Sequence, residues 1–348
     1  MKDTNLIIGK INTGKTRNIL FNEVNKAISN NENLFIFDDR DEYYITYSKK
    51  LKERNYNVLT LNLKNPLKSN GYNPLLAPYK LYKENKKDEA IGMITNVALE
   101  IFKLDDINAD PFWQNMAANY FSGLALILFN EADEEEINIG SIQTIMMQSE
   151  NKYNDSTYMK TYLETLDINN PIYILLSSVV FAPNDTRGSI LSVVKQKLNL
   201  YVVREQLLNL LNTNEIDLTK IHEKTAIFVI GKENISDIAN IFINQLISNA
   251  AVPFIYIFDN FDSLKTVLGI KELLSDASYN KNKVFVSVHS EAAIKEKYGN
   301  LIIDKFQNVL LLNDDEKYLY ELGNDDEYPT LNKKQHNYFN FEKFMERR

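Results

Sequence analysis

The chain has 348 residues, no cysteine and a formal net charge of −8 at pH 7. The absence of cysteine excludes a disulfide scaffold, a thiol nucleophile and a zinc–thiolate site, and it favours a reducing compartment. No apolar run reaches the roughly 18 residues that a transmembrane helix needs, and the N-terminus has no signal-peptide pattern, so we expect a cytoplasmic protein.

The first predicted elements enclose a glycine-containing loop. An apolar run at residues 5–8 predicts a buried strand, and residues 17–27 place apolar side chains at helical spacing. The loop between them fits G-x-x-x-x-G-K-[ST], a pattern that binds nucleotide phosphates when it joins a strand to a helix. Its members are Gly9, Lys10, Ile11, Asn12, Thr13, Gly14, Lys15 and Thr16. We expect them, with Arg17, to bind nucleotide; the alternative is a chance match in an ordinary turn.

The residue types in this loop suit phosphate chemistry. Gly9 and Gly14 allow turns that other residues resist, so that backbone N–H groups and the helix N-terminus can face an anion. Lys15 is expected to contact the β- and γ-phosphates, and the Thr16 hydroxyl to ligate Mg²⁺.

The next segments continue a pattern of alternating strands and helices. Residues 34–37 and 57–63 read as strands, and residues 43–54 and 80–103 as helical. This alternation predicts a parallel sheet flanked by helices. The charged run Asp38–Glu42 follows a strand, and it is either the edge of a ligand site or a solvated loop.

The pattern of predicted elements changes at about residue 104, from alternating strands and helices to helices alone. Asp110 and Pro111 precede a strongly apolar helix, in which Trp113 is expected to be a core anchor. The segments that read as helices are 112–130, 141–148, 157–166, 172–181 and 185–211. We therefore predict an all-α insertion over residues 104–215.

The sheet then resumes. Residues 225–230, 253–258, 283–288 and 308–312 read as strands, and residues 235–251, 265–278, 291–298 and 314–322 as helices. The predicted fold is α/β, with a nucleotide-binding domain made of residues 1–103 and 216–325. The tail, residues 326–348, has no evident role in a core.

One strand end carries the second acidic element that a nucleotide site needs. Residues 254–258 are apolar and lead into Asp259, which we expect to hold the metal. The next residue in such sites is usually a glutamate that acts as general base, but here it is Asn260, which can position water and cannot take its proton. Asp262 or Asp38 are alternative bases. Nucleotide binding is thus better supported than turnover.

Three histidines occur in the chain. His289 ends the strand expected to neighbour the Asp259 strand, where a polar side chain can sense the γ-phosphate; a capped or surface histidine is the alternative. His222 and His336 have no partner in the sequence pattern and are expected to be structural or surface residues.

Further segments carry a resemblance to one family. They are residues 35–75, which end in LNLKNPLKSNGYNPL, residues 111–113 (PFW), 182–191 (APNDTRGSIL), 224–230 (KTAIFVI), 259–261 (DNF) and 289–290 (HS). With the loop at residues 9–16, they resemble the TraG-like coupling proteins of type IV secretion, which are conjugative DNA-transfer ATPases. The resemblance covers residues 5–322.

The resemblance implies a RecA-like P-loop fold with an all-α insertion, and binding of ATP and Mg²⁺ through Lys15, Thr16 and Asp259. It also implies a homo-oligomeric ring that moves single-stranded DNA or a relaxase–DNA complex. Arg40 or Arg187 could act across a subunit interface.

The chain departs from the family pattern at several positions. Asn260 stands where the family usually has Glu, His289 where it has Gln, and Asp39 and Asp41 where it has Pro and Gly. The sequence lacks the family's membrane-spanning N-terminal region. We therefore expect a protein in the cytoplasm or peripheral to the inner face of the cell membrane, which it reaches through a partner or a missing segment.

Two functions remain open at this point. The first is an ATPase motor for DNA transfer. The second is a nucleotide-binding but catalytically weak adaptor of a secretion or conjugation system, which Asn260 favours. A third reading is an unrelated P-loop protein, for which no helical insertion is expected.

Overall fold

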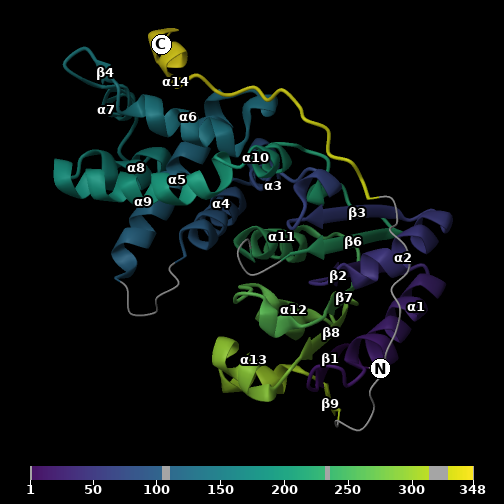
Figure 1. The fold of residues 1–348 in the computed structure, drawn as a ribbon. Helices are drawn as coiled ribbons and strands as arrows, with labels where there is room; N and C mark the ends of the chain where they lie inside the picture. The colour runs from purple at the N-terminus through teal and green to yellow at the C-terminus, as the bar shows by residue number, and fades with distance from the viewer. Residues whose placement is uncertain (1, 104–109, 232–235, 313–327, 348) are drawn as a thin grey trace. The chain divides into compact units, whose positions relative to one another are not determined.

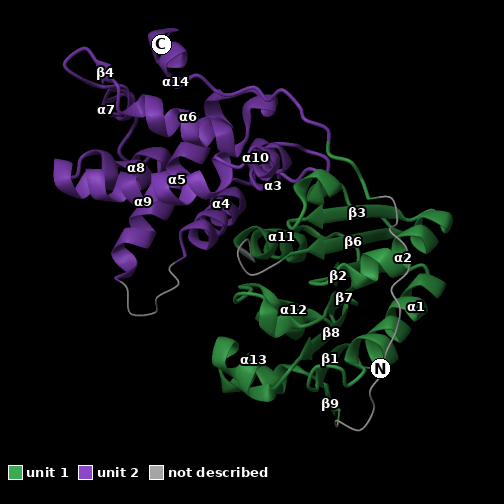
Figure 2. Ribbon diagram, viewed as in Figure 1, with its two compact units in different colours: residues 1–70, 216–331 green, residues 71–215, 332–348 purple. Residues whose placement is uncertain are grey.

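The computed structural model describes residues 2–103, 110–231, 236–312 and 328–347. The chain forms two compact units (Figure 2). Unit 1 contains Met1–Asn70 and Ile216–Leu331, and unit 2 contains Gly71–Glu215 and Asn332–Arg348. None of the described helices is long and apolar enough to span a membrane.

Unit 1 is built on a parallel sheet (Figure 1). In the described part of the chain it has seven strands in the order β3-β6-β2-β7-β8-β1-β9. They are β1 (Thr4–Ile8), β2 (Asn33–Phe37), β3 (Asn57–Asn62), β6 (Thr225–Ile230), β7 (Phe254–Phe258), β8 (Lys283–Val288) and β9 (Asn308–Leu311). Every pairing in this sheet is parallel, which confirms the predicted α/β fold.

The register of the sheet brings three strand ends together. Ile8 of β1 is level with Val288 of β8, and Phe258 of β7 is level with Val286 of β8. The segments that follow β1, β7 and β8 therefore meet at the carboxyl edge of the sheet, where ligands bind in open α/β folds.

The core of unit 1 forms because the strands are apolar on both faces. The residues of β1, β2, β6 and β7 are all buried. The helices of this unit are α1 (Phe21–Ser29), α2 (Glu42–Glu53), α11 (Ser236–Asn249), α12 (Ile270–Asp276) and α13 (Glu291–Tyr298). Val24 of α1 and Leu51 of α2 join a cluster with Phe228 of β6, and each is completely buried. Burial of such a side chain contributes about 1.5–3 kcal/mol.

The helix predicted over residues 265–278 is wrong at its start, because α12 begins only at Ile270. The preceding backbone donors bond to side chains instead of to a helical turn. The Val267 N–H donates to the Tyr298 hydroxyl at 2.9 Å, and the Gly269 N–H donates to Oδ1 of Asn244 at 2.9 Å. The predicted helix at 314–322 lies outside the described residues.

The turn before α2 explains one departure from the family pattern. Asp41 has a φ of 65°, in the left-handed region that favours glycine, which is the family's residue at this position. The N-terminus of α2 is capped by the side chain of Asp38. It accepts hydrogen bonds from the backbone N–H groups of Glu42, Tyr43 and Tyr44 at 2.9–3.0 Å.

Comparing Asp41→Ala with Asp41→Gly isolates this backbone effect. Both variants lose the 3.0 Å ion pair to Lys64, so their difference reports conformation alone. We expect Asp41→Ala to have a free energy of unfolding about 1 kcal/mol lower than Asp41→Gly, because alanine resists positive φ. Urea denaturation measures it; equal midpoints would contradict the argument.

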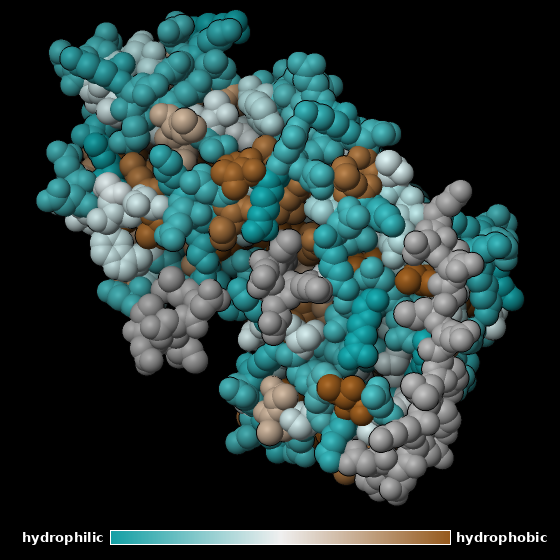
Figure 3. All heavy atoms as spheres, viewed as in Figure 1, coloured by the Kyte–Doolittle hydropathy of each residue, from teal (hydrophilic) through white to brown (hydrophobic). Residues whose placement is uncertain are grey.

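Unit 2 is a helical assembly around a buried central helix, α5. Its helices are α3 (Leu76–Lys83), α4 (Lys87–Phe102), α5 (Pro111–Glu131), α6 (Ile139–Ser149), α7 (Tyr158–Glu164), α8 (Pro171–Val180), α9 (Asn184–Val202), α10 (Glu205–Leu211) and α14 (Phe341–Arg347). Gly123 of α5 faces Leu176 of α8, and an added Cβ would lie 2.5 Å from the leucine side chain. On the face drawn in Figure 3, hydrophobic residues gather over unit 2, whereas hydrophilic residues cover most of unit 1.

Unit 2 differs from the predicted insertion in several details. The helical segment at 80–103 is divided into α3 and α4 at Asn85, whose φ is 65°. The helix predicted over 185–211 is divided near Arg204, whose backbone is extended. A short hairpin of β4 (Lys152–Tyr153) and β5 (Ser156–Thr157) was not predicted. Residues 71–103, expected in the nucleotide-binding domain, lie in unit 2 because α4 packs along α5.

The C-terminal tail has a core role, contrary to the prediction. Helix α14 packs against α6 and α7 of unit 2. Phe341 is completely buried, its ring lies 5.7 Å from that of Tyr162, and its N–H donates to Oε1 of Gln148 at 2.9 Å. The pattern of Tyr and Phe residues did not reveal this role, because the partners of Phe341 lie far earlier in the chain, 193 residues in the case of Gln148.

Phe341→Ala is expected to destabilise unit 2 by about 3–5 kcal/mol, the usual cost of removing a fully buried phenylalanine ring. The measurement is thermal unfolding followed by circular dichroism. Lys343→Ala, an exposed position on the same helix, is the control and should change little. Equal melting temperatures for the two variants would show that the tail adds nothing to the core.

Candidate nucleotide-binding site

The loop after β1 adopts the conformation that a phosphate-binding loop requires. Gly14 has a φ of 81°, and an added Cβ would lie 2.5 Å from the Asn18 side chain. A π-helical turn, η1 (Lys15–Leu20), begins directly after it and leads into α1. The loop therefore presents its backbone toward the start of a helix, where N–H groups attract anions.

Lys15 is held inside this loop. Its side chain is buried, and Nζ donates to the carbonyl oxygens of Gly9 and, at 3.0 Å, Lys10. Thr13 Oγ1 donates to the same Lys10 carbonyl at 2.9 Å. Burial lowers the pKa of Lys15, and the Asp259 carboxylate opposes that shift. The ammonium group is thus bound by neutral carbonyls, which a phosphate could replace.

Asp259 is the centre of the polar network at the sheet edge. One carboxylate oxygen, Oδ2, accepts from Thr16 Oγ1 at 2.6 Å and from the Tyr43 hydroxyl at 3.0 Å. The other, Oδ1, accepts from the Ser287 hydroxyl and from the Asn260 N–H. The register of β1, β7 and β8 thereby joins residues that are more than 240 positions apart in sequence.

Thr16 and Asp259 have the chemistry of a Mg²⁺ site. A hydroxyl and a carboxylate oxygen are hard ligands of the kind that Mg²⁺ prefers, and this ion usually completes its octahedron with water and phosphate oxygens. Within the described ranges, no group of three or more His, Cys or acidic side chains could hold a metal alone. The oxygen pair therefore fits a cation that arrives with a nucleotide.

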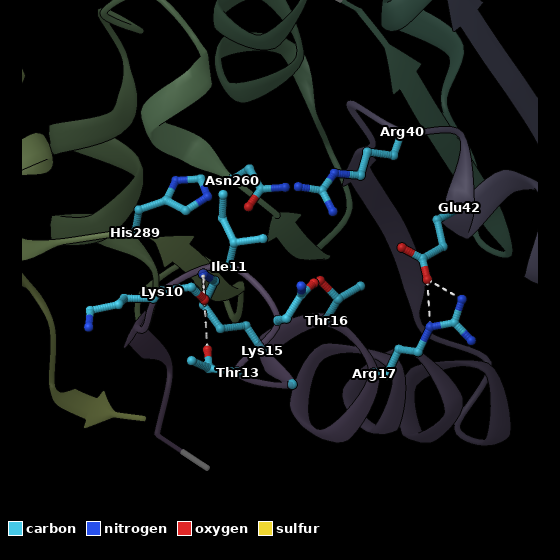
Figure 4. A pocket seen from close by; sticks show the side chains of 12 residues that line it. Lys10, Ile11, Thr13, Lys15, Thr16, Arg17, Arg40, Glu42, Asn260 and His289 are labelled. Carbon is cyan, nitrogen blue, oxygen red and sulfur yellow. Dashed lines mark hydrogen bonds and ion pairs between the residues drawn. The ribbon is translucent and has the colours of Figure 1, made fainter. Parts of the chain in front are cut away.

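A pocket of about 250 Å³ opens above the loop (Figure 4). It is lined by Lys10, Ile11, Asn12, Thr13, Gly14, Lys15, Thr16, Arg17, Arg40, Glu42, Asn260 and His289. In Figure 4, the side chains of His289, Asn260 and Arg40 lie across the pocket from Lys15 and Thr16. Most of the residues that the sequence proposed for nucleotide binding thus share one cavity.

Asn260 has a backbone reason for being asparagine. Its φ is 52°, in the left-handed region that asparagine tolerates better than glutamate. Its Nδ2 donates to Oδ1 of Asp39 at 3.3 Å, and burial raises the pKa of Asp39. The amide is therefore fixed on the pocket wall with its oxygen available to accept a hydrogen bond.

His289 is paired with Asp262, a contact that the sequence did not reveal. Oδ2 of Asp262 is 2.7 Å from Nδ1 of His289 and also accepts from the His289 backbone N–H at 3.0 Å. His289 lines the pocket, whereas Asp262 does not. Asp262, one of the two alternative candidates for the base, therefore contacts a pocket residue but does not itself line the pocket.

The other candidate residues have different positions. The buried carboxylate of Asp38 is engaged by the α2 backbone, although burial raises its pKa to about 7. Arg17 donates to Glu42 at 2.6 Å, and both line the pocket. Arg187 belongs to unit 2, where its guanidinium is 3.5 Å from Glu150. His336 also lies in unit 2, and its Nε2 is 2.9 Å from Oδ1 of Asn209.

Two residues that bond to Asp259, Tyr43 and Ser287, were not predicted from the sequence. Ser287 had a signal, because it is the polar residue within the apolar run of β8. Tyr43 had none, since its contact joins the first turn of α2 to a strand end 216 residues later in the sequence.

Comparison with known families adds an independent observation. The family model for type IV secretory system conjugative DNA transfer matches residues 13–268. The chain belongs to this family. The predicted resemblance is therefore confirmed. No curated protein sequence matches the chain.

Solved structures of a bacterial conjugative coupling protein have a similar fold. The plasmid coupling protein TrwB in complex with ADP and Mg²⁺ has a TM-score of 0.61 at 11% identity, over 88% of this chain and 70% of that one. TrwB with the ATP analogue ADPNP has a TM-score of 0.59 at 11% identity, over 88% and 70%. An unbound form, TrwBdeltaN70, has 0.59 at 10% identity, over 87% and 66%. The chain thus spans about two thirds of these solved chains, with which it shares the RecA-like P-loop fold.

Proposed function

We propose that this protein is an ATP-dependent motor that binds ATP·Mg²⁺ in the pocket of unit 1 and couples its turnover to movement of single-stranded DNA or a relaxase–DNA complex. The family to which the chain belongs is that of conjugative DNA transfer. TrwB, which has a similar fold, has been solved with ADP and Mg²⁺.

The observation that carries the proposal is the 2.6 Å hydrogen bond between Thr16 Oγ1 and Asp259 Oδ2, next to the buried Lys15. In P-loop NTPases, a loop hydroxyl and a strand-end carboxylate hold Mg²⁺ while the loop lysine binds the β- and γ-phosphates. These three side chains supply that set here.

Three side chains of the pocket then have distinct roles toward the nucleotide. Bound Mg²⁺ would neutralise charge that develops on the phosphates. Lys15 exchanges its carbonyl partners for phosphate oxygens, and the loop N–H groups hold the remaining charge. The fixed amide of Asn260 orients a water molecule, and Arg40 places a cation on the opposite wall.

The proposal extends to partners. By analogy with the family, we propose a homo-oligomeric ring, located in the cytoplasm or at the inner face of the cell membrane through a partner. Arg40 or Arg187 would then reach a neighbouring subunit's nucleotide. Binding to DNA phosphates predicts an affinity that falls steeply with salt.

The test is Mg²⁺-dependent ATP turnover by the full chain, measured with and without single-stranded DNA. Stimulation by DNA that weakens as salt rises is the expected result. DNA binding that does not change with salt concentration would argue against a channel that binds the phosphates of DNA.

A second function is favoured by one observation, the replacement of the usual glutamate by Asn260, whose amide is bonded to Asp39. In this alternative, ATP binding stabilises a docking surface of a secretion or conjugation system, with little hydrolysis. Tight ATP binding without turnover, with or without DNA, would support the adaptor and exclude the motor.

A further inference from the structure

His289, which lines the pocket, is paired with Asp262 in a contact that the family pattern does not anticipate. Oδ2 of Asp262 accepts from both the backbone N–H and Nδ1 of His289, at 3.0 and 2.7 Å. Because an ionised carboxylate only accepts hydrogen bonds, this contact requires the proton of a neutral imidazole to sit on Nδ1. Nε2 is then left with its lone pair free to accept a proton.

Asp262 is itself firmly positioned. Its side chain is only 9% exposed. Lys297 of α13 donates to the backbone carbonyl oxygens of Asp262 and Leu264, both at 2.5 Å, and so fixes the loop that carries the carboxylate. Oδ1 of Asp262 is buried and has no hydrogen-bond partner in the described structure. A buried carboxylate in this state is stabilised when the imidazole beside it becomes positively charged.

His289 is open to the pocket. Its side chain is 35% exposed and lines the cavity together with Asn260. Figure 4 shows its ring beside the Asn260 amide. The charged side chains that face the same cavity are Lys10, Lys15, Arg17, Arg40 and Glu42. A water molecule held by Asn260 would therefore lie within a pocket that already holds an oriented base.

We propose that Asp262 and His289 form a dyad in which Nε2 of His289 is the general base for ATP hydrolysis, and Asp262 is its positioning residue. The inference rests on the proposed motor function and names the group that replaces the missing glutamate. An aspartate that orients a histidine and stabilises its charged form is a recurrent arrangement for proton abstraction.

In the proposed step, water attacks the γ-phosphate of ATP and His289 takes its proton. The water oxygen forms a bond to the γ-phosphorus while a water proton passes to Nε2. The bond between the γ-phosphorus and the bridging oxygen breaks, and its electron pair stays on the β-phosphate oxygen of ADP. The imidazolium then faces the Asp262 carboxylate until it returns the proton to solvent.

The first test needs no nucleotide. Nitrogen-15 NMR of the full chain should show His289 as the Nδ1–H tautomer, and the spectrum of His289→Gln assigns its signals among the three histidines. Asp262→Asn should shift this population away from Nδ1–H, while His222→Gln, at an exposed position, leaves it unchanged. Finding His289 mainly as Nε2–H in the wild type would overturn the proposal.

The second test is the pH dependence of turnover between pH 5 and 8, the range in which histidine usually changes charge. Wild-type kcat should fall toward acidic pH. His289→Gln should lower kcat by about 10²-fold or more, the usual share of a general base, and remove the acidic fall, while the affinity for a non-hydrolysable ATP analogue is retained. Asp262→Asn should give a smaller loss.

The outcomes separate this inference from the proposed function. Wild-type turnover that persists in His289→Gln with the same pH profile overturns the dyad and leaves the motor intact. A wild type that binds the analogue but never hydrolyses ATP overturns both. His222→Gln should match the wild type in every measurement.

Discussion

Lys15→Ala is expected to weaken the affinity for ATP·Mg²⁺ by about 10²–10⁴-fold, because it removes two charge-assisted hydrogen bonds worth about 1.5–3 kcal/mol each. The side chain is buried in the loop, where carbonyl oxygens already hold the ammonium group. Replacing them by phosphate requires little rearrangement of the backbone. Titration calorimetry with a non-hydrolysable ATP analogue measures the effect, and turnover should disappear in parallel.

The matched control for this variant is Lys10→Ala. Lys10 belongs to the same loop and lines the same pocket, but its side chain is exposed. A small loss of affinity is expected, since solvent screens the attraction between an exposed lysine and the nucleotide phosphates. If Lys10→Ala and Lys15→Ala weaken binding equally, general positive charge, and not the buried ammonium, accounts for nucleotide binding.

Asp259→Asn is expected to abolish the dependence of nucleotide binding on Mg²⁺ and to lower turnover by about 10²-fold or more. The substitution keeps the size of the side chain and removes the charge that would face the cation. Asparagine also has a donor where Asp259 accepts from Thr16 and Tyr43, so the two hydroxyls lose their fixed partner. Binding without Mg²⁺ should be retained, because the phosphate loop remains intact.

The measurement for this second variant is nucleotide affinity with Mg²⁺ and with a chelator. The wild type should show a clear difference between the two conditions and Asp259→Asn none. Asp276→Asn, an exposed position at the end of α12, removes the same charge elsewhere and should behave as the wild type. An unchanged Mg²⁺ effect in Asp259→Asn would place the cation away from Asp259.

The sheet could be predicted from sequence because each strand is a local signal. Residues 254–258 form an apolar run that leads into an acidic residue. In a parallel sheet, the carboxyl end of such a strand lies at the same edge as the ends of its neighbours. The proximity of Thr16 and Asp259 follows from that topology, so it was accessible before the structure. Their roles toward ATP and Mg²⁺ remain proposals that the two variants above test.

The parts that could not be predicted depend on distant side chains. The start of α12 depends on hydrogen-bond acceptors from Tyr298 and Asn244, which no local sequence pattern reveals. The pairing of Asp262 with His289 has the same origin, because it joins the ends of two neighbouring strands. The role of the tail was not predicted, since its Tyr and Phe residues alternate with polar ones and the burial of Phe341 depends on α7.

The topology of both units makes folding wait for segments that are synthesised late. The phosphate loop is made well before its partner Asp259 and the neighbouring strand β8. Unit 2 also waits, because α14 packs on α6 and α7 although all of β6 to β9 separate them in the sequence. Neither unit can therefore complete its core until these later segments have been made. Truncated products would expose apolar surface, which makes them substrates for chaperones and proteases.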